Sequence, residues 1–283
     1  MNDYNLNLFL MHIKIKGSQR TAEDYEKNIK RFFSKCNKSE EEVGYEDLLV
    51  YYNDYLSDLK VNSKRAYMMA VLSYFKFLYQ QDKIQSDITK AFRLPQAELK
   101  DMEYLNTEEA LAVSRACDRE VQNRLRKKAM FIMFVNAGMR ASELANLELE
   151  DIKDEWIIIK KGKGHKFRTI PLHPSVKEAI NLYIKHERRS RSPYLFVNRC
   201  GNKLTNSIIN RDLERIIESA NIDKNITAHR LRDSFATIQY INGADIKSIQ
   251  ETLGHSNIQM TLHYVQKVDE KRRDQVVKAG VQF

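Results

Sequence analysis

The chain of 283 residues is long enough for two domains, and its 42% hydrophobic and 30% charged residues are typical of a folded globular protein. Its formal net charge of +9 suits a polyanionic partner, although charge by itself says nothing about the fold. These values exclude a disordered chain, and the scarcity of glycine (9) and proline (4) disfavours a turn-rich all-β fold.

The first ninety residues predict a bundle of four helices. Apolar residues recur at helical spacing over 3–16, after Gly17-Ser18, over 45–59 and over 63–81. Short polar connections between amphipathic helices are typical of a small bundle, which we place at 1–92. Four basic residues on or beside the later helices are candidates for contacts with phosphates of a polyanionic partner: Lys60, Lys64, Arg65 and Lys76. The alternative is that each lies on an ordinary solvated helix face.

A linker and a second domain follow the bundle. Pro95 disfavours helix in the residue before it, so an extended linker is expected over 93–103. A second domain over 104–283 then begins with Asn106 as a helix cap and Glu109 closing a capping box. Helical patterns continue over 107–118 and 124–137.

The only clear β region is a predicted hairpin. Its strands are the β-branched run Trp156–Ile159 and a return strand over 167–172, joined at Gly162-Lys163-Gly164. Helices resume over 174–190 and 206–220. The fold class expected is therefore mainly α with a small antiparallel β-sheet, in two domains.

Cysteine usage and hydropathy indicate the cellular compartment of the protein. The three cysteines are widely spaced and form no Cys-x-x-Cys, so neither disulfides nor cysteine metal sites are expected. The start of the chain lacks the basic and apolar regions of a signal peptide, and the most apolar run, Ala129–Val135, is too short to cross a bilayer. We therefore expect a cytoplasmic protein without a membrane partner.

A His-x-x-Arg pattern occurs three times, so it decides nothing by itself. The pairs are His165/Arg168, His186/Arg189 and His229/Arg232. Only the third follows a helix start, with Thr227 as cap and a buried stripe through Leu231. A His and an Arg one turn apart on such a helix are held rigidly, which makes this pair a candidate for chemistry.

Two further basic residues lie at turns. Gly138 marks a helix C-cap, so Arg140 is expected in a helix–helix elbow where it projects into a cleft. The alternative for Arg140 is a surface salt bridge with Glu143. Lys163 lies between two glycines, which suggests a tip that brings an ammonium to a ligand. The alternative for Lys163 is an exposed, solubilising turn.

These pieces occur in a recognisable order. They are Gly-Met-Arg140-x-Ser-Glu143, Gly-Lys163-Gly followed by Arg168-Thr-Ile-Pro171, His229-x-x-Arg232, Leu-Gly-His255-Ser, and Tyr264 nine residues later. In this order the chain resembles the tyrosine recombinase (phage integrase) family, with a layout similar to Xer-like and integron- or transposon-type integrases. The resemblance covers essentially the whole chain and is strongest over 104–267. Asp233, where many members have His, and Ser86-Asp87-Ile88, in place of Asn-Pro, depart from the family pattern.

The resemblance implies a two-domain DNA clamp, with a SAM-like core-binding bundle and a catalytic domain. It implies site-specific recombination through a 3′-phosphotyrosyl intermediate and a Holliday junction, without cofactor or metal. The roles that it implies are phosphate binding for Arg140 and Arg232, acid/base catalysis for His229, general acid for Lys163, phosphate hydrogen bonding for His255, and nucleophile for Tyr264. Glu143 is expected to orient Arg140 or His229 without contacting the phosphate itself.

The implied partners are double-stranded DNA recombination sites and further copies of the chain in a homotetramer, in association with the nucleoid. An apolar C-terminal tail is expected to dock on a neighbouring protomer, with a frayed terminus as the alternative: Val276, Val277, Val281 and Phe283. Two other functions share many of these features. One is a type IB topoisomerase-like nicking and relaxing enzyme, and the other is a non-catalytic DNA-binding relative.

Overall fold

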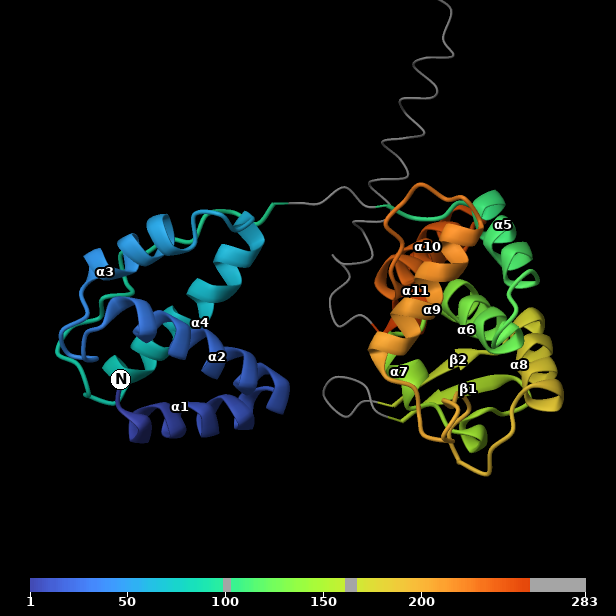
Figure 1. Cartoon of the computed structure of the whole chain (residues 1–283), viewed down its shortest axis with the longest axis horizontal. Helices are drawn as coiled ribbons and strands as arrows, with labels where there is room; N and C mark the ends of the chain where they lie inside the picture. Colours follow the sequence, from blue (N-terminus) through green and yellow to red (C-terminus); the bar gives the residue numbers. More distant parts are fainter. Residues whose placement is uncertain (99–102, 161–166, 255–283) are drawn as a thin grey trace, which may run out of the picture. The chain divides into compact units, whose positions relative to one another are not determined.

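The computed structural model describes residues 1–98, 103–160 and 167–254. These residues form two compact units, divided between Lys100 and Asp101 (Figure 1). Both units are built mainly from helices, and the second also contains a two-stranded antiparallel sheet. The predicted fold class, mainly α with a small antiparallel sheet, is confirmed.

The first unit is the predicted helical bundle. Its elements are α1 (Asp3–Lys16), α2 (Gln19–Cys36), α3 (Tyr45–Val50), the π-helix η1 (Tyr51–Tyr55) and α4 (Val61–Gln80). Aromatic rings fill its core edge-to-face, with centroids 4.9 Å apart for Phe32 and Tyr51 and 5.3 Å apart for Phe9 and Tyr74. The buried Tyr74 hydroxyl donates a hydrogen bond of 2.6 Å to the Glu40 carboxylate. Helices with one apolar face therefore pack around a single aromatic core.

The third helix departs from the prediction of a regular helix over 45–59. After Val50 the chain widens into a π-helix, closed by the Leu56 N–H donating to the Tyr51 carbonyl at 3.2 Å. This bond spans five residues, so it brings Tyr51 and Leu56 to the same side of the helix. Both side chains are buried. Core packing thus determines the irregular turn, which periodicity along the sequence did not indicate.

The segment 93–98 is irregular and is bound to the first unit. The Arg65 guanidinium donates to the Pro95 carbonyl, and the Asn62 side chain forms hydrogen bonds of 2.9 and 3.1 Å with the Glu98 backbone. Half of the expected linker therefore lies against α4. The predicted domain boundaries at 92 and 104 stay predictions.

The second unit is organised around helix α6. Its elements are α5 (Thr107–Cys117), α6 (Arg124–Ala137), α7 (Ala141–Ala145), η2 (Leu149–Asp151), β1 (Trp156–Ile159), β2 (Arg168–Pro171), α8 (Pro174–His186), α9 (Asn206–Ser219), α10 (Ala228–Ile241) and α11 (Ile246–Leu253). Helix α6 lies at the centre and contacts α5, α8, α9 and α10 (Figure 1). Its apolar side chains, such as Met130 and Phe134, are fully buried. The capping box of Asn106 and Glu109 starts α5 as predicted.

The sheet matches the predicted hairpin. Strands β1 and β2 are antiparallel, and their register pairs Ile157 with Ile170 and Ile159 with Arg168. The isoleucine side chains of both pairs are buried in the core of the second unit. The turn expected at Gly162-Lys163-Gly164 lies outside the described residues.

Helix α8 ends at His186, four residues earlier than predicted. The next residue, Glu187, accepts hydrogen bonds of 2.8 and 3.2 Å from the Leu125 and Arg126 N–H groups at the start of α6. Arg188 then donates to several carbonyls of the following loop. These contacts satisfy polar groups of two other segments. If α8 continued past His186, these contacts would be lost.

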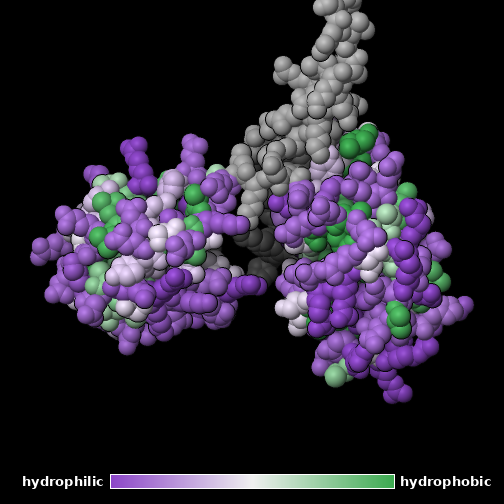
Figure 2. Space-filling model, turned by 45° about the horizontal axis from the view of Figure 1, so that its top comes forward, coloured by the Kyte–Doolittle hydropathy of each residue, from purple (hydrophilic) through white to green (hydrophobic). Residues whose placement is uncertain are grey.

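The surface of both units is mostly hydrophilic on the face shown in Figure 2, with separate hydrophobic patches. Among the described residues, no helix is both long and apolar enough to cross a membrane. Helix α1 nevertheless exposes an apolar stripe, on which Tyr4, Met11 and Ile15 are 70%, 62% and 86% exposed. Their spacing of seven and four residues places them on one side of the helix.

A buried ion pair joins α6 to α9. The Arg126 Nη2 lies 2.7 Å from Asp212 Oδ2, and both side chains are almost fully buried. The Arg126 Nη1 also donates to the Val197 carbonyl at 3.0 Å. A guanidinium that loses its carboxylate in such a place stays desolvated without a counter-charge.

We expect Asp212→Ala to lower the free energy of unfolding by about 3–5 kcal/mol, because it leaves Arg126 as an unpaired buried charge. Chemical denaturation of the whole chain measures this. The control is Lys177→Met, which removes an exposed pair with Asp154 at 3.6 Å and should cost less than about 1 kcal/mol. Equal effects of the two substitutions would contradict the prediction.

Candidate active site

Three arginines gather at the C-terminal end of helix α11. The Arg168 Nε donates to the Thr252 carbonyl at 2.9 Å, the Arg232 Nη2 to the Leu253 carbonyl, and the Arg140 Nη2 to the Gly254 carbonyl at 3.4 Å. Carbonyls at a helix C-terminus lack intrahelical partners and carry the negative end of the helix dipole. This helix end therefore collects positive charge from three distant parts of the sequence.

Arg140 lies in the predicted elbow between α6 and α7. Gly138 ends α6 in the left-handed conformation, with φ of 58°, and Arg140 is the N-cap of α7. A Cβ at Gly138 would lie 2.5 Å from a ring carbon of Phe235, so only glycine fits this turn. The Arg140 side chain is 37% exposed, which leaves its guanidinium accessible to a ligand.

The Glu143 carboxylate is saturated with hydrogen bonds. Its Oε1 accepts from Arg168 Nη1 at 2.7 Å and from Arg140 Nη1 at 2.8 Å. Its Oε2 accepts from Arg168 Nη2 at 2.7 Å and from the Arg140 backbone N–H at 2.8 Å. Four hydrogen bonds fill the acceptor capacity of a carboxylate. Of the two alternatives for Glu143, the geometry thus favours orienting Arg140 over orienting His229.

The pKa of Glu143 lies below its ordinary value despite burial. Burial alone raises the pKa of this carboxyl, but the hydrogen bonds and charge of Arg168, followed by the hydrogen bonds from Arg140, outweigh that effect. Glu143 therefore stays ionised at neutral pH and holds both guanidiniums in place.

Arg232 ties the ends of two helices together. Thr227 caps α10 as predicted, which places Arg232 in the second turn of the helix. The side chain is only 2% exposed, and its Nη1 donates to the Gly138 carbonyl at 2.5 Å while Nη2 reaches Leu253. The end of α6 and the end of α11 are thereby joined through one guanidinium.

His229 occupies a different position from the arginines. Its side chain is 74% exposed, and its Nε2 lies 4.0 Å from Asp233 Oδ1. Asp233 is buried and is also 3.2 Å from Arg230. The structure thus brings Arg140, Glu143 and Arg232 together and leaves His229 on the surface beside Asp233.

The other predicted catalytic residues, Lys163, His255 and Tyr264, lie outside the described residues, as do the apolar residues of the tail. Their roles stay predictions. Gly254, which directly precedes His255, has φ of 64° and ends α11.

The four basic residues of the first unit do not form one patch. Lys64 lies over the Tyr52 ring at 5.2 Å, and Arg65 holds Pro95. Lys60 is the N-cap of α4, and Lys76 is exposed near the other end of that helix. At about 100° per residue, Lys64 and Lys76 point about 120° apart. A DNA contact that used both Lys64 and Lys76 would therefore involve different sides of α4.

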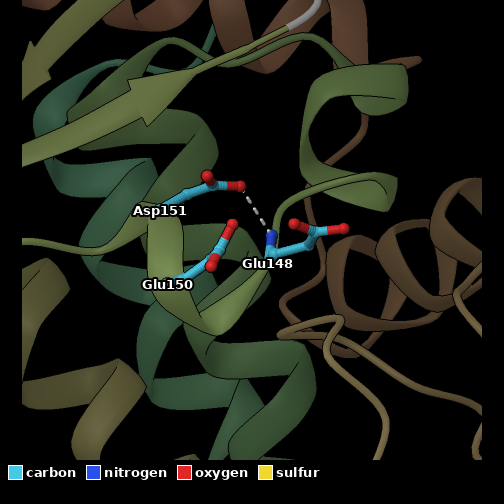
Figure 3. Close-up of side chains that lie close together, drawn as sticks. All are labelled: Glu148, Glu150 and Asp151. Atoms are coloured by element: carbon cyan, nitrogen blue, oxygen red, sulfur yellow. Dashed lines mark hydrogen bonds between the residues drawn. The ribbon is translucent and has the colours of Figure 1, made fainter.

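Sequence reasoning missed two charged groups next to the site. Arg168 belongs to the motif Arg168-Thr-Ile-Pro171, but its position at the start of a strand did not indicate that it binds Glu143. Glu148, Glu150 and Asp151 also come together, with ligand oxygens within 4.8 Å of one another (Figure 3). The Lys160 ammonium pairs with all three, at 3.2 Å from Glu148 and 2.7 Å from Asp151. A lysine thus provides the positive charge that a metal ion would otherwise supply.

Comparison with known proteins gives consistent matches. The Phage integrase family model matches residues 103–271. "Tyrosine recombinase XerD" of Halalkalibacterium halodurans is 30% identical over 284 residues, covering 95% of each chain. The crystal structure of XerA recombinase matches 99% of both chains with a TM-score of 0.56 and 25% identity. A lambda integrase tetramer bound to a Holliday junction matches 90% of this chain and 77% of its own, with a TM-score of 0.75 and 18% identity.

We expect Lys160→Met to lower the melting temperature at neutral pH, because three clustered carboxylates lose their cation. The hydrogen bond from Lys160 lowers the pKa of Glu150, so the stability it contributes is present above the ordinary pKa of 4.5 and is lost as pH falls through the lowered value. The difference from the wild type should therefore shrink in acid. Thermal melts from pH 3 to 7 test this.

Lys185→Met is the matched control for that experiment, because it removes the same charge from an exposed position on α8. A pH-independent difference, or one equal to the control, would show that Lys160 does not stabilise the cluster.

Proposed function

The chain belongs to the phage integrase family and is a tyrosine recombinase that catalyses site-specific DNA recombination, and from this we propose how its own residues divide the reaction. Arg140 and Arg232 bind the scissile phosphate. Tyr264 attacks it, and Glu143 holds Arg140. The roles of Lys163, His229 and His255 follow from their places in the matched motifs.

The observation that carries this proposal is the convergence of Arg140 and Arg232 at the end of α11. A phosphodiester under attack gains negative charge on its non-bridging oxygens, and guanidiniums stay protonated and donate paired hydrogen bonds to such oxygens. Cations fixed before the reaction stabilise this charge without reorganising. The exposed Arg140 is the group that a phosphate would meet first.

In the proposed cleavage step, the Tyr264 phenolic oxygen forms a bond to phosphorus, and the bond from phosphorus to the 5′-oxygen breaks. His229 takes the phenolic proton, and Lys163 gives a proton to the leaving 5′-oxygen. His255 donates a hydrogen bond to a non-bridging oxygen. Attack by a 5′-hydroxyl reverses these events, so rejoining needs no nucleotide cofactor.

Both units take part in the proposed DNA complex. We assign residues 1–92 to a core-binding domain, 93–103 to the linker and 104–283 to the catalytic domain. The net charge of +9 supports binding of a polyanion. Lys60 and Lys76 are the more available of the four basic residues on α4, because Lys64 and Arg65 already have partners within the unit.

The proposed assembly on DNA is a homotetramer that exchanges strands through a Holliday junction, as in the lambda integrase complex. The exposed stripe of Tyr4, Met11 and Ile15 supports association, since apolar side chains exposed along one helix favour contact with another protein surface. The apolar tail is proposed to dock on a neighbouring copy through Val276, Val277, Val281 and Phe283.

A topoisomerase-like enzyme and a non-catalytic relative were the alternatives. No observation favours either, and the matches to Xer recombinases extend over both units.

We expect Tyr264→Phe to abolish the covalent DNA–protein adduct and to retain DNA binding, because phenylalanine keeps the ring but lacks the attacking oxygen. Denaturing gels with end-labelled DNA measure the adduct, and mobility shifts measure binding. Tyr240→Phe is the matched control and should form the adduct normally. Adduct formation by Tyr264→Phe would remove Tyr264 from the nucleophile role.

We expect Met11→Ser/Ile15→Ser to reduce synaptic complexes at least about tenfold while leaving binding to a single site unchanged, because two exposed apolar side chains lose their buried area in the assembly. Sedimentation of protein–DNA complexes measures both states. Lys14→Ala, also exposed on α1, is the control. Unchanged synapsis would exclude this stripe from the interface.

A further inference from the structure

Arg168 connects three elements through all of its nitrogen atoms. From the start of β2, its Nη1 and Nη2 each lie 2.7 Å from one oxygen of Glu143 on α7. Its Nε donates to the Thr252 carbonyl of α11 at 2.9 Å. The side chain is 12% exposed, so little of it is available to a ligand. Each of the three side-chain nitrogens of this arginine therefore donates to a protein group.

The position of Arg140 depends on this arrangement. A bidentate pair with Arg168 fixes the plane of the Glu143 carboxylate. The same two oxygens accept from the Arg140 guanidinium and the Arg140 backbone N–H, both at 2.8 Å. If Arg168 were absent, the carboxylate would keep only its two hydrogen bonds from Arg140, and Arg140 would have a less firmly fixed partner.

Arg168 also sets the charge that Arg140 presents. One carboxylate shared by two guanidiniums leaves a net charge of about +1 in this group. The group therefore stays positive although Glu143 is ionised.

The chain that leaves α11 runs directly against Arg168. A Cβ built on Gly254 would lie 2.9 Å from Arg168 Cδ and 3.2 Å from its Nε. With φ of 64° at the same residue, both backbone and space require glycine. The next residue in the sequence is His255. Arg168 therefore determines where the chain leaves α11 toward a predicted catalytic residue.

We propose that Arg168 is a positioning residue of the strand-cleavage site, acting on Arg140 through Glu143 and on the exit of α11 through Thr252 and Gly254. The proposal rests on the function proposed above. Arg168 touches no substrate in this role. A lysine cannot replace it, because a single ammonium does not provide a planar fork for Glu143 together with a third donor for Thr252.

The first experiment compares Arg168→Met and Arg168→Lys with the wild type on nicked DNA that traps the covalent adduct. At saturating protein, both substitutions should lower the single-turnover cleavage rate by about 100-fold, the effect expected when a catalytic cation is misplaced. DNA affinity, measured by mobility shift, should change far less. Cleavage at the wild-type rate by Arg168→Met would overturn the proposal.

The second experiment tests whether Arg168 acts through Glu143. The double variant Arg168→Met/Glu143→Gln should cleave about as slowly as the slower single variant. The reason is that both changes disrupt the same interaction, the pair between Arg168 and Glu143. Fully multiplicative effects would show that the two residues act independently, and would overturn the proposed path.

The pH profile gives a readout that a loss of folding would not produce. In Arg168→Met, burial still raises the pKa of Glu143 while the largest opposing effect is gone. Cleavage by this variant should therefore recover as the pH rises and Glu143 ionises. Glu143→Gln should lack this recovery. The same pH dependence in both variants would contradict the role of Arg168.

Arg188→Met is the matched structural control, because Arg188 also binds backbone carbonyls but contacts neither Glu143 nor α11. It should lower the melting temperature without changing the pH profile. Adduct formation by the wild type and by Tyr264→Phe tests the proposed function separately. If the wild type forms an adduct that depends on Tyr264 and Arg168→Met cleaves normally, only the positioning role fails.

Discussion

The second unit depends on how the last turn of α11 is satisfied. Its final carbonyls have no partner within the helix, and three arginines from a helix elbow, a strand and another helix donate to them. Arg168 also binds α7, and Arg232 also binds the end of α6, so α6, α7, β2, α10 and α11 are fixed relative to one another. The three positive guanidiniums would otherwise repel one another, but the backbone dipoles at the end of α11 and the Glu143 carboxylate hold them close together.

This arrangement assigns different tasks to similar side chains. Arg232 is buried and joins two helix ends, Arg168 donates to protein groups from each of its nitrogens, and Arg140 keeps an exposed guanidinium. An enzyme that stabilises a phosphoryl transition state benefits from such a division, because the accessible cation is held by groups that do not move. The carboxylate at the centre is ionised because its neighbours outweigh the cost of burial.

Local signals predicted much of this structure. Glycine at 138, Thr227 as cap and the apolar period of Arg124–Ala137 involve residues close in sequence, and each was confirmed. The π-turn at Tyr51, the early end of α8 and the Arg168–Glu143 pair depend on groups distant in sequence, which periodicity cannot report. Motif order singled out Arg140 and Arg232 through resemblance, whereas the exposed position of His229 became visible only in the structure.

The three carbonyls that collect the arginines belong to residues 252–254, more than a hundred positions after Arg140. During synthesis the N-terminus of the chain leaves the ribosome first. The first unit and most helices of the second unit therefore emerge before the last turn of α11. Until α11 has emerged and packed, Arg140 and Arg232 have no common anchor. A nascent chain therefore carries its cations apart, and the three arginines come together only after α11 has left the ribosome.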